Sequence, residues 1–197
     1  MKKILILDNY DSFTYNLVHA VRSLGYTGVD VVRNDKVDLD LVEQYDKIIL
    51  SPGPGIPEEA GDMLPLIERY AFTKSMLGVC LGHQAIGVVF GAKLENIPFV
   101  FHGVQTIAYI VKEDPLFEGL PSELPVGRYH SWLISRDDFP GELEITAIDD
   151  ENNIMAIKHK KLDVHGVQFH PESVLTPQGI TIIQNFLNIN NNERNAI

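Results

Sequence analysis

The first 90 residues alternate between short apolar segments and amphipathic segments, and this alternation limits the possible folds more than any other feature of the sequence. Runs rich in β-branched residues and leucine predict buried strands at 3–7, 29–32, 46–50 and 76–79. Apolar residues spaced three or four apart predict helices at 13–24, 39–43, 62–72 and 81–90. A regular succession of strand and helix is typical of a parallel sheet with helices on both faces.

The pattern changes in the second half of the chain. From about residue 93 to residue 168 it predicts short strands separated by turns, followed by a last helix at about 177–187. We therefore expect an α/β fold with one domain, an open and mainly parallel sheet flanked by helices, and an antiparallel extension. We place this domain at 1–189 and expect 190–197, which contain three consecutive asparagines, to be a flexible tail.

Composition and charge argue against several classes of partner and location. The chain has 16 Lys and Arg against 27 Asp and Glu, a formal net charge of −11, which disfavours nucleic acids and anionic membrane surfaces. A single cysteine cannot form an internal disulfide, which favours a reducing compartment. The N-terminal apolar run is too short for a signal peptide, and no apolar run is long enough to span a membrane. We expect a cytoplasmic protein.

The only cysteine, Cys80, lies where a predicted strand meets a predicted helix, with Gly78 and Gly82 on either side. A nucleophile on a sharp strand-to-helix turn crowds the backbone, and glycines at these two positions remove side chains that would clash. The helix N-terminus favours a thiolate, and the amide of Leu81 would point to a developing oxyanion. A lone cysteine is most often a small buried hydrophobe, but the flanking glycines favour a nucleophile.

His170 is the candidate general base among the seven histidines. It ends a predicted strand at 164–169 and precedes Pro171, which favours an extended conformation at His170. Extended residues two apart face the same side, so Glu172 would hold the imidazole in the tautomer that accepts the thiol proton. An isolated His-Pro-Glu is more often a solvated turn. We expect His19 and His83 to be structural or solvated.

The loop at 51–55, Ser-Pro-Gly-Pro-Gly, follows a predicted strand and therefore lies at the same sheet edge as Cys80. It is not a phosphate-binding loop, because Pro54 has no amide hydrogen and no third glycine or Gly-Lys-Ser/Thr follows. The loop suits an oxyanion donor or a substrate clamp, and a simple tight turn is the alternative. We find no cluster with metal-ligand spacing, and we expect neither a metal nor another cofactor in this chain.

Three separated segments together resemble the class I, triad-type glutamine amidotransferases and occur in that family's order: 78–84 around Cys80, the loop at 51–55, and 166–172 around His170. Two further segments, 8–16 and Tyr129-His130-Ser131, resemble most the glutaminase subunits of anthranilate synthase (component II) and aminodeoxychorismate synthase. The resemblance covers the chain up to about Leu187. Trp132 stands where leucine is expected, a change that a backbone contact would tolerate.

The resemblance implies that Cys80 attacks the side-chain amide of L-glutamine, that His170 passes the proton to the leaving ammonia, and that Glu172 orients His170. It implies oxyanion donors at the amides of Leu81 and Gly55. The implied substrate-binding residues are Gly53, Pro54, Gly55, Gln84, Ser131 and Trp132.

The resemblance also implies a heteromeric complex with a larger synthase subunit (component I), which binds chorismate and Mg²⁺ and receives the ammonia. We expect Asn9, Tyr10, Asp11 and Ser12, together with the segment 129–132, to form part of the docking surface, and docking to complete the glutamine site. We expect anthranilate, in tryptophan biosynthesis, as the product of the complex; the alternative is the same role in aminodeoxychorismate synthase, for 4-aminobenzoate and folate, or in both. A non-catalytic regulatory subunit would be expected to lack a triad residue, and a redox sensor would need a second cysteine.

Overall fold

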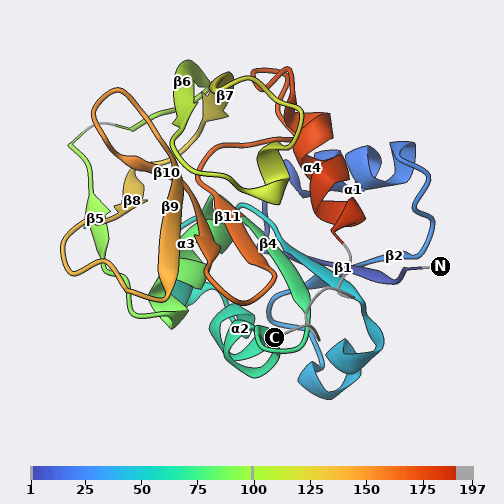
Figure 1. The fold of residues 1–197 in the computed structure, drawn as a ribbon. Coiled ribbons are helices and arrows are strands. Elements are labelled where there is room, and N and C mark those ends of the chain that lie inside the picture. Colours follow the sequence, from blue (N-terminus) through green and yellow to red (C-terminus); the bar gives the residue numbers. More distant parts are fainter. Residues whose placement is uncertain (1, 99, 190–197) are drawn as a thin grey trace.

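The computed structural model describes residues 2–98 and 100–189 (Figure 1). A nine-stranded sheet with the order β2-β1-β3-β4-β11-β10-β9-β6-β7 forms the body of this part. The first five strands in this order are mutually parallel: β2 (Val29–Arg33), β1 (Ile4–Asp8), β3 (Lys47–Leu50), β4 (Ser75–Val79) and β11 (Val164–Val167). The others are antiparallel to their neighbours: β10 (Ile154–His159), β9 (Leu143–Ile148), β6 (Val104–Ile110) and β7 (Glu123–Arg128). This confirms the expected α/β fold with an antiparallel extension.

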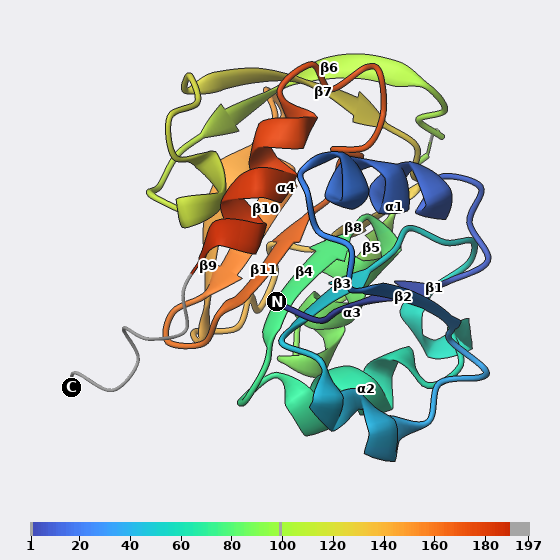
Figure 2. The same cartoon turned by 90° about the vertical axis from the view of Figure 1, so that its right-hand side faces the viewer.

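Helices cover both faces of the sheet because the central strands are apolar on both sides. In β1, Ile4 and Ile6 pack in one core with α1 (Thr14–Ser23) and α4 (Gly179–Asn188), while Leu5 and Leu7 pack in a second core with α2 (Met63–Tyr70) and α3 (Leu81–Val89). Figure 2 shows α1 and α4 on the side of the sheet opposite α2. Alternation of neighbouring residues between two cores is what a strand buried on both faces requires.

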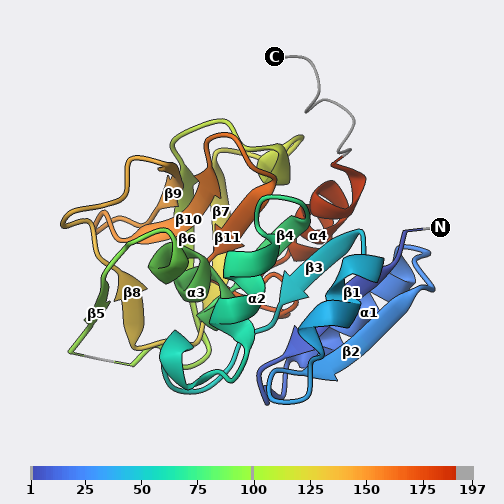
Figure 3. The same cartoon turned by 90° about the horizontal axis from the view of Figure 1, so that it is seen from below.

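A two-stranded antiparallel sheet lies beside the main one. It consists of β5 (Leu94–Asn96) and β8 (Trp132–Ile134), and Figure 3 shows it next to α3. The contact is close at Gly87, where a Cβ would lie 2.5 Å from Cδ1 of Ile134. This small sheet matters for the site, because β8 starts at one of the predicted substrate-binding residues.

Several predicted boundaries differ from the structure. The helix predicted at 39–43 is a 3₁₀ helix, η1 (Leu39–Gln44). Asp38 caps its N-terminus, because the side chain of Asp38 accepts a hydrogen bond from the amide of Asp40. Two further 3₁₀ turns, η2 (Pro57–Glu59) and η3 (Pro115–Phe117), were not predicted. The strand predicted at 164–169 ends at Val167, so His170 lies in the following loop. The predicted tail at 190–197 lies outside the described residues.

The register brings four chain segments to one edge of the sheet. Leu7 pairs with Leu50, Leu50 pairs with Gly78, and Val167 pairs with Val79, so β1, β3, β4 and β11 end at nearly the same level. The segments that follow them contain the predicted docking loop, the loop at 51–55, Cys80 and His170. At the opposite edge the two described ends of the chain meet, where Lys2 Nζ donates to the carbonyl of Leu187 at 2.8 Å.

Within 2–98 and 100–189, none of the helices has the length and apolar character needed to cross a membrane.

Candidate active site

Cys80 occupies a sharp turn between β4 and α3. Its φ of 52° and ψ of −100° lie in a region that residues with a side chain rarely adopt. The turn is held from both sides, because the amide of Cys80 donates to the carbonyl of Val167 at 2.9 Å and its carbonyl accepts from the amide of Gln84 at 3.1 Å. The thiol is thus presented at the N-terminus of α3 on a strained backbone.

The two flanking glycines are required by close packing. A Cβ on Gly78 would lie 2.4 Å from the carbonyl group of Gly82, and a Cβ on Gly82 would lie 2.5 Å from the carbonyl oxygen of Leu50. Both contacts are with backbone atoms, which cannot move aside as a flexible side chain does. A side chain at either position would therefore clash with the backbone, as the sequence pattern suggested. Glycine at both positions allows the helix to start this close to the strands.

His170 and Glu172 form a buried pair beside the cysteine. His170 Nδ1 and Glu172 Oε1 are 2.7 Å apart, and the two side chains are 2% and 0% exposed. Burial disfavours the charged imidazole, but the neighbouring side chains of Cys80 and Glu172 outweigh this effect and raise the pKa of His170 to about 10. The rings of Phe13 and Tyr129 pack against the imidazole, with centroids at 5.4 and 4.7 Å. The three residues predicted as a catalytic triad thus lie together.

A cavity of about 170 Å³ opens beside the thiol. This volume suits a ligand of amino-acid size, since pockets for larger organic ligands exceed about 300 Å³. The cavity brings together all the predicted oxyanion and substrate-binding residues, and its lining consists of Gly53, Pro54, Gly55, Cys80, Leu81, Gln84, Val100, Tyr129, His130, Ser131 and Trp132. A larger cavity of about 740 Å³ lies near η3 and contains none of the predicted site residues.

The loop at 51–55 is held close to the start of α3. A Cβ on Gly53 would lie 2.6 Å from the Cβ of Asn9 and 2.7 Å from Cδ2 of Leu81. Gly55 has a φ of 73°, which glycine adopts without strain. The loop therefore places its backbone against Leu81, as a pair of oxyanion donors from these two segments would require.

Buried amide side chains connect the cavity wall to the thiol. Gln84 Nε2 donates to the carbonyl of Trp132 at 2.9 Å and to Oε1 of Gln168 at 3.1 Å. Gln168 Nε2 in turn lies 3.6 Å from Sγ of Cys80 and donates to it. Gln168 was not predicted as a site residue, although it lies within a motif of the sequence, two residues before His170. Tyr129, predicted only as part of the docking surface, also lines the cavity.

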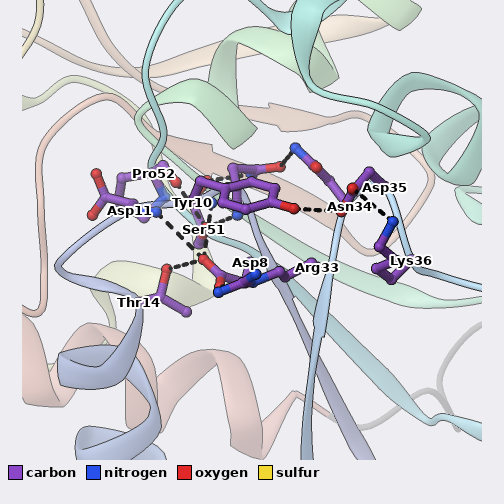
Figure 4. A network of polar contacts seen from close by, with 11 residues as sticks. Asp8, Tyr10, Asp11, Thr14, Arg33, Asn34, Asp35, Lys36, Ser51 and Pro52 are labelled. Carbon is purple, nitrogen blue, oxygen red and sulfur yellow. Dashed lines mark hydrogen bonds and ion pairs between the residues drawn. The ribbon is translucent and has the colours of Figure 1, made fainter.

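The predicted docking residues differ in exposure. Figure 4 shows Tyr10 and Asp11 in the polar network around Asp8. Asn9 is only 2% exposed, and its side chain links the carbonyl of Ser51 to Asn34, so its proposed contact with a partner is wrong in this structure. Tyr10 is 51% exposed, with its hydroxyl 2.8 Å from Asp35 Oδ1. The prediction of a docking surface therefore stays open for Tyr10, Asp11 and Ser12.

The first helix and the elbow helix contain the two histidines that were expected to be structural or solvated. His19 is exposed on α1. His83 lies on α3 and is fully buried, and burial lowers its pKa to about 3, so it is neutral. Among the described residues, no group of His, Cys, Asp and Glu side chains is placed to hold a metal ion. That the chain needs no cofactor stays a prediction.

Comparisons with known proteins identify relatives of this chain. Residues 5–189 match the family described as glutamine amidotransferase class-I. Anthranilate synthase component 2 of Pseudomonas aeruginosa is 46% identical over 191 residues, covering 93% of this chain and 94% of that protein. Anthranilate synthase component 2 of Lactococcus lactis is 45% identical over 196 residues, covering 98% of each. A solved Thermoplasma acidophilum protein, named as a candidate GMP synthase subunit, has a TM-score of 0.84 and 28% identity, covering 95% of this chain and 92% of its own.

Proposed function

We propose a function from one established premise: the chain belongs to the glutamine amidotransferase class-I family. It is the glutaminase subunit that hydrolyses L-glutamine to glutamate and delivers the ammonia to a chorismate-using synthase that makes anthranilate, a step of tryptophan biosynthesis. The observation that carries this proposal is the buried His170–Glu172 pair beside a strained Cys80 at a cavity of amino-acid size. The names of the relatives support anthranilate as the product.

The first half of the reaction releases ammonia. The thiolate of Cys80 attacks the side-chain amide carbon of glutamine, and the resulting oxyanion accepts hydrogen bonds from the amides of Leu81 and Gly55. His170, charged at neutral pH because its pKa is about 10, gives its Nε2 proton to the departing nitrogen. The carbon–nitrogen bond breaks, and a glutamyl thioester and ammonia remain.

The second half regenerates the thiolate. His170, now neutral, takes a proton from a water molecule, whose oxygen attacks the thioester carbon; the carbon–sulfur bond then breaks, the sulfur leaves as the thiolate and glutamate is released. Glu172 holds Nδ1 of the imidazole throughout, which leaves Nε2 as the ring nitrogen that exchanges the proton. The balance is glutamine plus water to glutamate plus ammonia, and every step uses groups of this chain.

The substrate's α-amino and α-carboxylate end is assigned to Gln84 and to the backbone of Ser131 and Trp132, which line the cavity. Because both donor hydrogens of Gln84 are directed at Trp132 and Gln168, the amide oxygen of Gln84 is the atom that faces an ammonium group. The polar wall of the cavity therefore fixes the end of the substrate that does not react.

The ammonia needs an acceptor, so the proposal includes a larger chorismate-binding partner. Tyr10, Asp11 and Ser12 are assigned to the surface that docks it, and docking completes the glutamine site. If the competent state is populated at about 1% in the isolated chain, the partner raises the apparent affinity for glutamine about 100-fold. A cytoplasmic location is part of the same proposal and rests on the single cysteine.

The test uses Cys80→Ala in the complex with the synthase. Glutamine-dependent synthesis should be lost while synthesis from ammonium salts continues, because the thiol serves only ammonia release. A glutamine analogue with an electrophilic carbon should label the wild-type chain once, at its only cysteine, and excess glutamine should prevent labelling. Loss of both activities in Cys80→Ala, or labelling that glutamine does not affect, would contradict the proposal.

A further inference from the structure

A series of hydrogen bonds between buried polar groups connects Asp149 to the carbonyl oxygen of Trp132. Arg128 Nη1 donates to Asp149 Oδ2 at 2.8 Å, and the two side chains are 2% and 1% exposed. Arg128 Nε donates to Nε2 of His130 at 3.1 Å, and His130 Nδ1 lies 3.1 Å from the carbonyl oxygen of Trp132. These groups come from β7, β8 and the turn after β9, all on the antiparallel side of the molecule.

A second series of hydrogen bonds connects the same carbonyl oxygen to the nucleophile, Cys80. Gln84 Nε2 donates to the Trp132 oxygen at 2.9 Å and to Gln168 Oε1 at 3.1 Å, and Gln168 Nε2 donates to Cys80 Sγ at 3.6 Å. Gln84 and Gln168 are 2% and 0% exposed. The carbonyl of Trp132 is therefore the junction between a branch that ends at Asp149 and a branch that ends at the sulfur.

In each hydrogen bond of this network, the chemistry of the groups at the ends of the network determines which atom donates and which accepts. Arginine only donates, so Nε2 of His130 has no proton and Nδ1 carries the proton that goes to the Trp132 oxygen. Burial and then the charge of Arg128 lower the pKa of His130 to about 3, so the ring keeps this neutral form at working pH. On the other branch, Gln168 accepts from Gln84, so its own nitrogen faces the sulfur.

The hydrogen bonds to the carbonyl of Trp132 help to fix the orientation of the backbone that lines the cavity. The carbonyl of Ser131 is also held, by the amide of Ile97 at 2.9 Å and by Nδ2 of Asn96 at 3.2 Å. A planar trans peptide points its N–H opposite its C=O, so fixing the carbonyls of Ser131 and Trp132 fixes the two peptide planes at the substrate end of the cavity. A wall whose polar groups are already oriented loses less entropy when it binds a ligand.

We propose that Arg128, His130 and Gln168 are positioning residues for the glutaminase reaction, joined through the carbonyl of Trp132. Arg128 and His130 orient the backbone that binds the unreacting end of the substrate. Gln168 orients the sulfur of Cys80 and favours its thiolate by donating to it. The inference rests on the proposed function, because it assigns roles to glutamine binding and to the thiol.

The two branches predict different defects. Arg128→Lys keeps the charge beside Asp149 but loses the N–H that fixes His130, so glutamine should bind about tenfold more weakly while the thiol reacts as before. Gln168→Leu should do the reverse: alkylation of Cys80 slows at neutral pH and its pH profile moves to higher pH, while glutamine affinity changes less than threefold.

Iodoacetamide provides both measurements, since the chain has one cysteine. Both values are measured on the complex with the synthase, in which the glutamine site is complete: the alkylation rate of Cys80 without glutamine reports the thiol, and the glutamine concentration that halves this rate reports binding. His159→Asn is the matched control, because His159 is a buried histidine on β10 that accepts hydrogen bonds from the amides of Lys161 and Leu162, away from the cavity. It should leave both values unchanged.

The network can also be tested without a substitution. In ¹⁵N NMR spectra of the wild-type chain, His130 should carry its proton on Nδ1 at both pH 6 and pH 8, and a proton on Nε2 would overturn the inference. So would unchanged glutamine protection in folded Arg128→Lys, or an equal loss in His159→Asn. If glutamine fails to protect wild-type Cys80, the proposed function is wrong, whereas the tautomer of His130 still decides whether the network exists.

Discussion

Replacing Cys80 by glycine should remove backbone strain that alanine leaves in place. The φ of 52° and ψ of −100° at this position bring a Cβ into conflict with the backbone, whereas glycine has no Cβ. Cys80→Ala and Cys80→Gly both lack the sulfur and are both inactive as glutaminases. The difference in their stability therefore isolates the effect of the Cβ atom.

The magnitude follows from three opposing contributions. Holding a non-glycine residue in such a region costs about 1–3 kcal/mol, which Cys80→Gly recovers. Glycine loses about 0.5–1 kcal/mol through its greater freedom in the unfolded chain, and removal of a buried methyl group loses about 0.8 kcal/mol more. With the strain at about 2 kcal/mol, Cys80→Gly should be about 0.5 kcal/mol more stable than Cys80→Ala.

Urea unfolding of the two variants gives the comparison, with Ala85→Gly against the wild type as the reference for an unstrained site. Ala85 is fully buried in α3, so its replacement should cost about 1.5–2 kcal/mol. On the thermal scale this is roughly 3–8 °C for a chain of this size. The result that would refute the reasoning is an equal loss of unfolding free energy in the two comparisons, from Cys80→Ala to Cys80→Gly and from the wild type to Ala85→Gly. The turn at Cys80 would then not be strained.

Three further changes test the site. Glu172→Gln removes a contact that raises the pKa of His170. Because the imidazolium must give a proton to the departing nitrogen, we expect glutaminase activity to fall at alkaline pH, near pH 10 in the wild type and at lower pH in the variant; an unmoved pH profile would take Glu172 out of the triad. Gly55→Ala, at a φ of 73°, should turn the amide away from the oxyanion and lower kcat by about 10², and wild-type kinetics would make this loop a simple turn. Gly82→Ala should push α3 from Leu50 and cost about 1–3 kcal/mol in urea unfolding, with a loss of turnover, and a variant of unchanged stability would mean that the helix start is not closely packed.

The elbow could be predicted because its requirements are local. Gly78, Cys80 and Gly82 are close in the chain, and the need for small residues follows from the turn itself. The order of strands and helices could also be predicted, because each element shows its own apolar period. Their ends were less accurate: the helix at 39–43 forms as a 3₁₀ helix, and the strand before His170 stops at Val167.

The rest of the site depends on contacts between distant parts of the chain. Gln168 reaches Cys80 across 88 positions, and Arg128 reaches Asp149 across 21. A single sequence contains no signal for such pairs, because each residue alone is an ordinary polar residue. Asn9 was misplaced for the same reason, since its burial depends on Ser51, which is 42 positions away.

Both described ends of the chain lie at the edge of the sheet opposite the cavity, and this position matters when the protein is fused to a partner or immobilised. Lys2 binds the carbonyl of Leu187 where β1 starts, while the thiol lies beyond the other end of the same strands. An affinity tag or a second enzyme joined at Lys2 or at residue 189, the limits of the described part, would be tethered away from the mouth of the cavity. Attached to a solid support through these ends, the protein would keep that mouth turned to the solution.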